Sequence, residues 1–100
     1  MSLHKPITKE QIQAIQNNSG NVQMIDIRSA VEYEKLHAPG AINIPVEQLA
    51  EKFSMFSKKD AIVCICNHGK ERSQNAAEIF FNAGFENAFY LEGGTSGWHT

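Results

Sequence analysis

The sequence has few of the features that mark membrane, secreted or nucleic-acid-binding chains. No apolar run approaches the roughly 18 residues of a membrane helix, and the N-terminus has no apolar signal-peptide core. The net charge of -2 provides no excess of positive charge for nucleic acid or an anionic membrane. We therefore expect a cytoplasmic protein that binds neither nucleic acid nor a membrane.

Cysteine is scarce as well, because the chain has only two, Cys64 and Cys66. Side chains two apart on a strand point to the same face, and such close neighbours do not form an ordinary structural disulfide framework. Reduced thiols fit the cytoplasm, where disulfides are rare. Together with His68, the two cysteines have neither the number nor the spacing of zinc ligands, so we expect no metal and no other cofactor.

The composition itself is that of one ordinary globular domain. A hydrophobic content of 42% with dispersed charges is typical of such a domain, and 100 residues support one core but not two. No internal repeat, low-complexity tract or linker interrupts the sequence. We expect residues 4–100 to form a single domain.

Short apolar runs alternate with helical patterns along the chain. The apolar runs predict strands over residues 22–27, 41–44, 62–65 and 88–91. Helices are expected after the capping boxes of Thr8 and Ser29, after Pro45, and from about Arg72 to Gly84. This alternation predicts an α/β fold with a mainly parallel central sheet of about five strands and helices on both faces.

Helical spacing also predicts which side chains face the core. These are Ile12 and Ile15; Tyr33 and Leu36; Leu49, Phe53 and Phe56; and Ala76, Ile79, Phe80 and Ala83. Trp98 is expected to cover one end of the core.

A reactive cysteine is expected where the most hydrophobic strand ends. Residues 62–65 form a continuous apolar run, typical of a strand that is buried on both faces. Cys66 then lies at the carboxyl end of this strand, the edge at which open α/β sheets bind ligands. Cys64, inside the strand, is expected to be a core residue.

The residues after Cys66 can stabilise a thiolate. Backbone amides of a loop that wraps back on itself form an anion-binding nest, and the helix that begins near Arg72 directs its positive end at the same point. Lys70 and Arg72 add charge, and the Ser73 hydroxyl can donate to the sulfur. These influences lower the pKa of the thiol and favour an anionic substrate. Without them, Cys66 is simply a small buried hydrophobe.

We identify Cys66 as the candidate nucleophile. The candidate anion-binding loop consists of Asn67, His68, Gly69, Lys70, Glu71, Arg72 and Ser73.

Five ordered blocks of the sequence resemble the rhodanese-like domain family. They are Met24-Ile-Asp-Ile-Arg-Ser-Ala-Val-Glu-Tyr-Glu34, His37-Ala-Pro-Gly-Ala-Ile-Asn-Ile-Pro45, Cys66-x-x-Gly69 with Arg72-Ser73, Ala76-Ala77 with Gly84-Phe85, and Leu91-Glu-Gly-Gly94 with Trp98. The resemblance implies a single-domain sulfurtransferase. Its Cys66 accepts a sulfane sulfur from thiosulfate or a persulfide donor, and a thiol, cyanide or a protein acceptor removes it.

The spacing within the loop departs from this family. Five residues separate Cys66 from Arg72, one more than in common single-domain members, and this is the spacing of cysteine phosphatases and arsenate reductases. A phosphatase or arsenate reductase is therefore one alternative, although phosphate hydrolysis also needs an acid, for which Glu71 is a candidate. A non-enzymatic binding or sulfur-relay module is another, but the presence of Cys66 favours chemistry.

Asp26 and Arg28 match the Asp-x-Arg that the family has after its second strand. Two residues apart, they share a face at the carboxyl end of the strand, near the loop. They either orient the active-site pocket or form a structural ion pair. His37 is expected to fix its own loop through a hydrogen bond.

Overall fold

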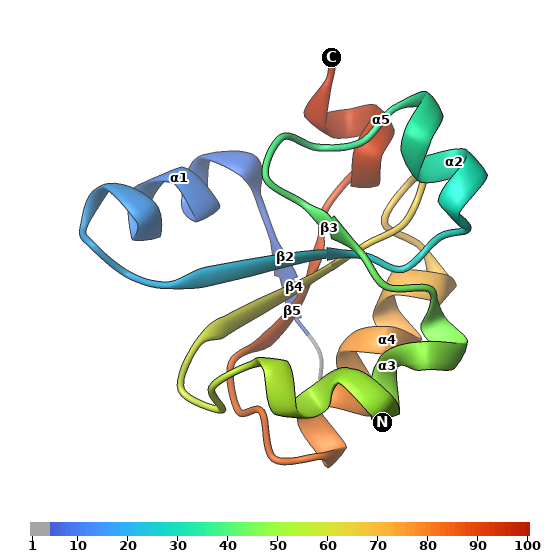
Figure 1. Ribbon diagram of the computed structural model, residues 1–100. Helices are drawn as coiled ribbons and strands as arrows, with labels where there is room; N and C mark the ends of the chain where they lie inside the picture. Colours follow the sequence, from blue (N-terminus) through green and yellow to red (C-terminus); the bar gives the residue numbers. More distant parts are fainter. Residues whose placement is uncertain (1–4) are drawn as a thin grey trace.

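The computed structural model describes residues 5–100, so the expected domain start at residue 4 lies outside the described part (Figure 1). The elements follow in the order β1 (Lys5–Ile7), α1 (Lys9–Asn17), β2 (Val22–Asp26), α2 (Ala30–Lys35), β3 (Ile42–Asn43), η1 (Val46–Gln48), α3 (Leu49–Lys52), η2 (Phe53–Met55), β4 (Ala61–Ile65), α4 (Glu71–Asn82), β5 (Ala88–Leu91) and α5 (Gly94–Trp98).

The strands form one parallel sheet of five strands in the order β1-β5-β4-β2-β3. The predicted α/β fold with a parallel sheet of about five strands is confirmed. β4 is the central strand, so the residue that follows it lies in the middle of the carboxyl edge of the sheet. That residue is Cys66.

Side chains of β4 alternate between two cores, one on each face of the sheet. Ile62 and Cys64 belong to the core beneath α3 and α4, which also contains Phe80. Val63 and Ile65 belong to the core on the face of α1. Figure 1 shows α1 and α5 on one side of the sheet and α3 and α4 on the other. All five residues of β4 are buried, as expected of a strand covered on both faces.

Both predicted capping boxes are present. The Thr8 hydroxyl accepts from the Gln11 amide at the start of α1, and the Ser29 hydroxyl accepts from the Glu32 amide at the start of α2. In each case a side-chain oxygen three residues on accepts a hydrogen bond from the backbone amide of the capping residue. Local sequence therefore fixes where these two helices begin.

The prediction that the Leu36 and Ile79 side chains face the core is wrong. Leu36 is 48% exposed, because α2 ends at Lys35 and the Leu36 backbone is already extended. Ile79 is 39% exposed, at the margin of the buried face of α4. The single helix expected after Pro45 is also broken, since two 3-10 turns flank one short α-helix.

Two elements were not predicted, β1 and α5. β1 has three residues, of which only Ile7 is buried, and it exists through its pairing with β5. α5 contains two glycines, which are poor helix formers. Both elements depend on the rest of the fold more than on their own sequence.

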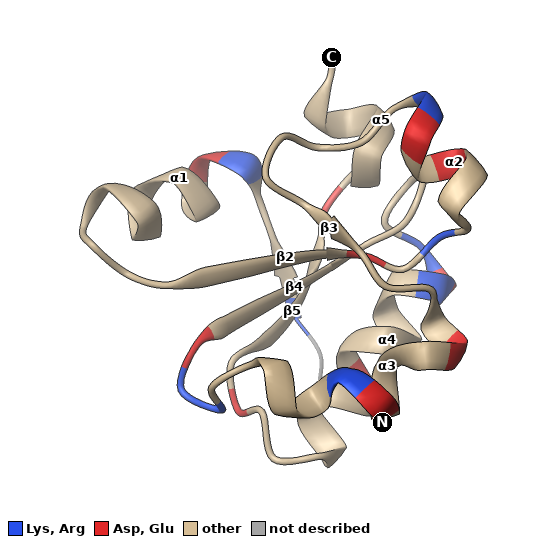
Figure 2. Ribbon diagram, viewed as in Figure 1, with Lys and Arg blue, Asp and Glu red and all other residues tan. Residues whose placement is uncertain are grey.

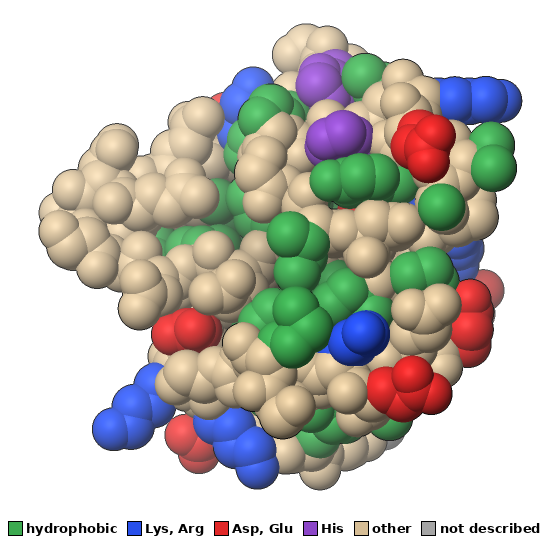
Figure 3. Space-filling model, viewed as in Figure 1, with side chains coloured by type: hydrophobic (Ala, Val, Ile, Leu, Met, Phe, Trp, Pro, Cys, Tyr) green, Lys and Arg blue, Asp and Glu red, His purple; other side chains and the backbone are tan. Residues whose placement is uncertain are grey.

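The surface carries charges of both signs, spread over most elements (Figure 2). On the face shown in Figure 3, hydrophobic side chains are exposed near the middle, over the edge strand β3. Ile42 and Val46, where β3 leads into η1, are both partly exposed. Within residues 5–100, no helix has the length and apolar character that crossing a membrane requires.

Candidate active site

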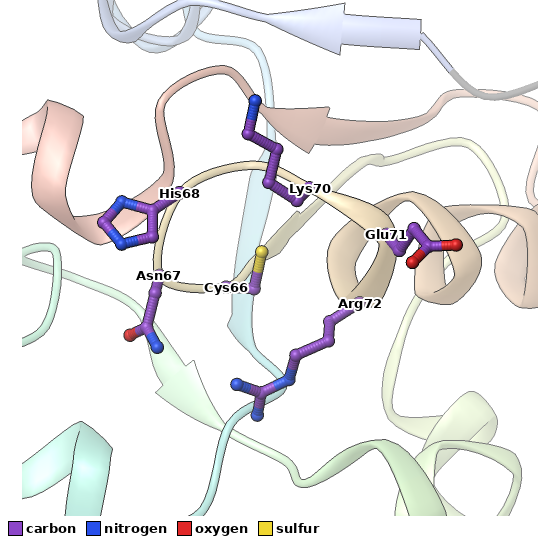
Figure 4. A pocket seen from close by; sticks show the side chains of 6 residues that line it. All are labelled: Cys66, Asn67, His68, Lys70, Glu71 and Arg72. Carbon is purple, nitrogen blue, oxygen red and sulfur yellow. The ribbon is translucent and has the colours of Figure 1, made fainter.

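A pocket of about 270 Å³ lies where β4 gives way to α4 (Figure 4). Its lining consists of Cys66, Asn67, His68, Lys70, Glu71 and Arg72. The structure thus brings together six of the eight residues of the candidate nucleophile and loop. The other two, Gly69 and Ser73, belong to the same loop but are buried and do not line the pocket.

The loop wraps around the Cys66 sulfur and directs backbone amides at it. The backbone amides of Lys70, Ser73 and His68 stabilise the Cys66 thiolate and so lower the pKa of its thiol. Among the described residues no side chain caps the start of α4, so the amides of its first turn remain available to an anion. Backbone amides arranged in this way are typical of an anion-binding nest.

The Ser73 hydroxyl oxygen lies 3.1 Å from the Cys66 sulfur. Burial raises the pKa of the Cys66 thiol, but the hydrogen bonds from the Ser73 hydroxyl and from the amides of Lys70, Ser73 and His68 lower it by more. The net pKa of Cys66 is therefore below the ordinary value of a thiol. The site favours the thiolate, which is the nucleophilic form of cysteine.

Cys64 has the opposite character. Its side chain is fully buried in the core, and burial raises the pKa of its thiol. It is a free cysteine, as Cys66 is. Within residues 5–100, no three His, Cys, Asp or Glu side chains come together as metal ligands.

Glycines allow the loop to lie directly on the turn after β5. Gly69 has a φ of +70°, and a Cβ there would lie 2.6 Å from the Leu91 carbonyl oxygen. Gly94 has a φ of +61°, and a Cβ there would lie 2.5 Å from the Cys66 carbonyl oxygen. Each position combines a left-handed backbone with backbone contact, which only glycine satisfies.

α5 holds the loop through its first amides. The Thr95 amide donates to the Cys66 carbonyl oxygen at 2.9 Å, and the Ser96 amide donates to the Asn67 carbonyl oxygen at 3.0 Å. The carbonyl oxygens of the loop are thereby turned away from the pocket, while its amides face the sulfur. The predictions assigned no role to α5, because these contacts join residues that are nearly 30 positions apart.

Asp26 and Arg28 form a buried ion pair that also touches the loop. Two guanidinium nitrogens of Arg28 donate to the two carboxylate oxygens of Asp26, at 2.9 and 2.7 Å. A third donates to the Asn67 side-chain oxygen at 2.7 Å. The hydrogen bond to Asp26 raises the pKa of Arg28. The pair is thus both a structural ion pair and an anchor for the first residue of the loop.

Arg72 lines the pocket but does not point at the sulfur. Figure 4 shows its side chain running away from the Cys66 sulfur. Its guanidinium lies 3.4 Å from a carboxylate oxygen of Glu32, on α2. Figure 4 also shows the Glu71 carboxylate turned away from the sulfur. Sequence reasoning placed Glu32 only in a capping box and did not detect its contact with the loop.

His37 makes the kind of hydrogen bond expected of it. Its Nδ1 lies 2.7 Å from the Tyr33 carbonyl oxygen, and its ring stacks on the Tyr33 ring at 3.8 Å between centroids. The Tyr33 hydroxyl in turn donates to the Ala41 carbonyl oxygen. These contacts fix the segment between α2 and β3, whose Leu36 carbonyl oxygen accepts from Arg28, the residue that also donates to Asn67.

A central parallel strand that leads into a cysteine, a loop whose amides surround its sulfur, and a helix is the arrangement of a small α/β domain built around one cysteine. A family model described as the rhodanese-like domain matches residues 8–100 of this chain. The chain therefore belongs to the rhodanese-like domain family.

Relatives with assigned activities agree with this membership. The thiosulfate sulfurtransferase GlpE of Shewanella oneidensis is 37% identical over 79 residues, which are 79% of this chain and 77% of that protein. The putative sulfur carrier protein YrkF of Bacillus subtilis is 31% identical over 78 residues, which are 78% of this chain and 42% of that protein. The identity to GlpE confirms the predicted enzyme class, a rhodanese-like sulfurtransferase.

Solved structures show the same fold. The crystal structure of a rhodanese-related protein from Thermoplasma volcanium superposes with a TM-score of 0.79 at 26% identity, over 96% of this chain and 91% of that one. The likeness extends over nearly the whole length of both chains.

Proposed function

We propose that a single domain moves a sulfane sulfur from a small anionic donor, thiosulfate or a persulfide, to a thiol or cyanide acceptor through a persulfide on Cys66. The observation that carries this proposal is the surroundings of the Cys66 sulfur. It lies at a pocket whose backbone amides and Ser73 hydroxyl are directed at it. The identity to a thiosulfate sulfurtransferase supports thiosulfate as one donor.

The reaction has two displacement steps. The Cys66 thiolate attacks the outer sulfur of thiosulfate, the sulfur–sulfur bond of the donor breaks, and sulfite leaves with the bonding electron pair. The product is a Cys66 persulfide that carries one negative charge. A thiolate or cyanide then attacks its terminal sulfur and releases the Cys66 thiolate. Splitting one transfer into two steps in this way is covalent catalysis.

The loop residues supply electrostatic support for both steps. Amides that stabilise the thiolate also stabilise the terminal sulfur of the persulfide, which lies one bond further into the pocket. Lys70 and Arg72, exposed at the rim, would attract the anionic donor. Asn67, His68, Gly69, Glu71 and Ser73 would form the rest of the anion-binding loop.

The pocket opens to the surface, since His68 and Lys70 are exposed at its rim. A thiol of another protein is therefore a possible sulfur acceptor. The two free cysteines fit a reducing compartment, and we propose that the protein works in the cytoplasm.

A phosphatase or arsenate reductase activity is the second candidate. The five residues between Cys66 and Arg72 favour it, since that loop length suits a tetrahedral oxyanion. It requires an acid for the leaving group, and the Glu71 carboxylate is turned away from the sulfur (Figure 4). A binding or sulfur-relay role is the third, and the name of YrkF as a putative sulfur carrier is in keeping with it.

The deciding experiment is intact mass spectrometry after incubation with thiosulfate. We expect a gain of one sulfur atom that cyanide removes and that the Cys66→Ser variant does not show. An aryl phosphate assay runs in parallel on both proteins. Phosphate release that depends on Cys66, without sulfur uptake, would replace the proposal by the phosphatase. Activity in neither assay would favour the binding module.

A further inference from the structure

Glu32 lies outside the pocket lining, yet its carboxylate contacts two residues of the loop. One oxygen accepts from the Asn67 side-chain amide at 3.2 Å, and the other lies 3.4 Å from the Arg72 guanidinium. Glu32 belongs to α2, whereas Asn67 and Arg72 are loop residues that lie close to its two ends. One carboxylate therefore bridges both ends of the anion-binding loop.

Hydrogen bonds within α2 hold the Glu32 carboxylate in this position. The Ser29 backbone amide and hydroxyl donate to the same Glu32 oxygen, at 3.2 and 3.1 Å, as part of the capping box of α2. Its pKa is lowered to about 2 by the hydrogen bond from Arg72, together with those from Ser29 and Asn67. Glu32 is thus ionised at neutral pH and held by its own helix.

Arg72 is the partner that is free to move. Its side chain is 49% exposed, and it meets Glu32 through one long contact of 3.4 Å. An exposed pair of this kind contributes little to stability, so Arg72 can exchange Glu32 easily for another anion. Arg28 is the contrast, because it is buried and doubly hydrogen-bonded to Asp26. Of the two arginines at the loop, one is fixed and one can change partners.

We propose that Glu32 is a positioning residue whose carboxylate holds the Arg72 guanidinium at the rim of the pocket. When the donor binds, its anionic oxygens replace Glu32 as the partner of Arg72. Glu32 thereby sets the affinity of the site for doubly charged oxyanions, because each such anion must compete with the Glu32 carboxylate for the Arg72 guanidinium. The inference rests on the proposed function for the identity of the donor. It does not require turnover to be observed.

The test compares Glu32→Gln with Glu34→Gln. Glutamine at position 32 keeps the capping box, in which Glu and Gln serve equally, and removes the charge that holds Arg72. Glu34 is an exposed residue of the same helix, and within residues 5–100 it has no ion pair, so its replacement removes the same charge without touching the loop. Each variant is also made in an Arg72→Ala background.

Sulfate is the probe anion, and its dissociation constant is measured by its protection of Cys66 from alkylation by iodoacetamide. We expect Glu32→Gln to lower this constant about two- to fivefold, the range that the loss of an exposed ion pair allows. Glu34→Gln should leave it unchanged, and Glu32→Gln should have no effect in the Arg72→Ala background. With thiosulfate as substrate, KM should fall by the same factor while kcat stays within about twofold.

Three results would overturn the inference: an unchanged sulfate constant in Glu32→Gln, the same fall in Glu34→Gln, or a fall that persists without Arg72. Thermal melts of all variants check that the capping box has kept the fold. If sulfate binding tightens as expected but thiosulfate is never turned over, the proposed function fails and the role of Glu32 stands.

Discussion

The Ser73 hydroxyl oxygen lies between the Cys66 sulfur, at 3.1 Å, and the Lys70 carbonyl oxygen, at 3.2 Å. When Cys66 is a thiol, it can donate to this hydroxyl, which donates to the carbonyl. When Cys66 is a thiolate, the hydroxyl can turn and donate to the sulfur. One buried hydroxyl therefore serves both protonation states, and no buried polar atom of the pair is left without a partner in either.

Ser73→Ala is expected to make Cys66 less reactive. The change removes the largest of the hydrogen bonds that lower the pKa of the thiol, while the amides remain. A hydrogen bond to a charged group contributes about 1.5–3 kcal/mol, so the alkylation rate of Cys66 at neutral pH should fall about tenfold or more. Iodoacetamide kinetics across pH measure this, and the midpoint of the profile should move to higher pH. Ser54→Ala, on the exposed side of η2, is the control. An unchanged midpoint would contradict the role of Ser73.

Glu32 should make stability depend on pH. Its folded pKa of about 2 lies below the ordinary value, so its ionised form stabilises the folded protein. This stabilisation is fully present above the ordinary pKa of about 4.3 and is lost as the pH falls towards 2. In urea unfolding, wild type should therefore exceed Glu32→Gln in stability at pH 7, and the difference should shrink between pH 5 and pH 3. A difference that stays constant with pH would show that the charge is not responsible.

Gly94→Ala is expected to disturb both stability and the active-site loop. The new Cβ would meet the Cys66 carbonyl oxygen at 2.5 Å and would also impose a left-handed backbone on alanine. Gly40→Ala is a matched control, because Gly40 has a φ of +87° but a Cβ there meets nothing within 4 Å. The control should cost about 1 kcal/mol, and Gly94→Ala should cost more, because backbone strain is joined by a steric clash. Urea unfolding and Cys66 alkylation measure the two effects. Equal losses in both variants would show that the contact with the loop does not matter.

Asp26→Asn should destabilise the protein strongly. It leaves the buried Arg28 without its counter-charge, and breaking a buried pair in this way costs about 3–5 kcal/mol. Because Arg28 also holds the Asn67 side chain, the KM for thiosulfate should rise in the molecules that remain folded. Urea midpoints and steady-state kinetics below the melting temperature test both effects. Glu47→Gln, an exposed substitution on η1, should change neither.

Features that depend only on residues close together in the chain were predictable from the sequence. The apolar run of β4 and the capping boxes of Thr8 and Ser29 are local, and all three are present in the structure. The position of Cys66 after a strand buried on both faces followed from the same local pattern. The family resemblance then gave the enzyme class.

Features that depend on distant partners were not predictable. β1 exists because β5 lies beside it, and the contact of Glu32 with Arg72 spans 40 residues of sequence. The expectation that Arg72 contributes its charge at the sulfur could not include the competing carboxylate, since the direction of a long exposed side chain is decided by its tertiary neighbours. Periodicity likewise counted Leu36 as helical, although α2 had already ended.

The amides of Thr95 and Ser96 have a consequence for the order in which the site is completed. During synthesis Cys66 leaves the ribosome well before residues 94–98. Until those residues follow, the carbonyl oxygens of its loop have no α5 amides from which to accept hydrogen bonds. Cys66 and the amides of its loop are thus made early, and the α5 amides that fix the loop carbonyl oxygens are made late. In a newly made chain, the Thr95 and Ser96 amides can hold the carbonyl oxygens of Cys66 and Asn67 only after α5 has been synthesised.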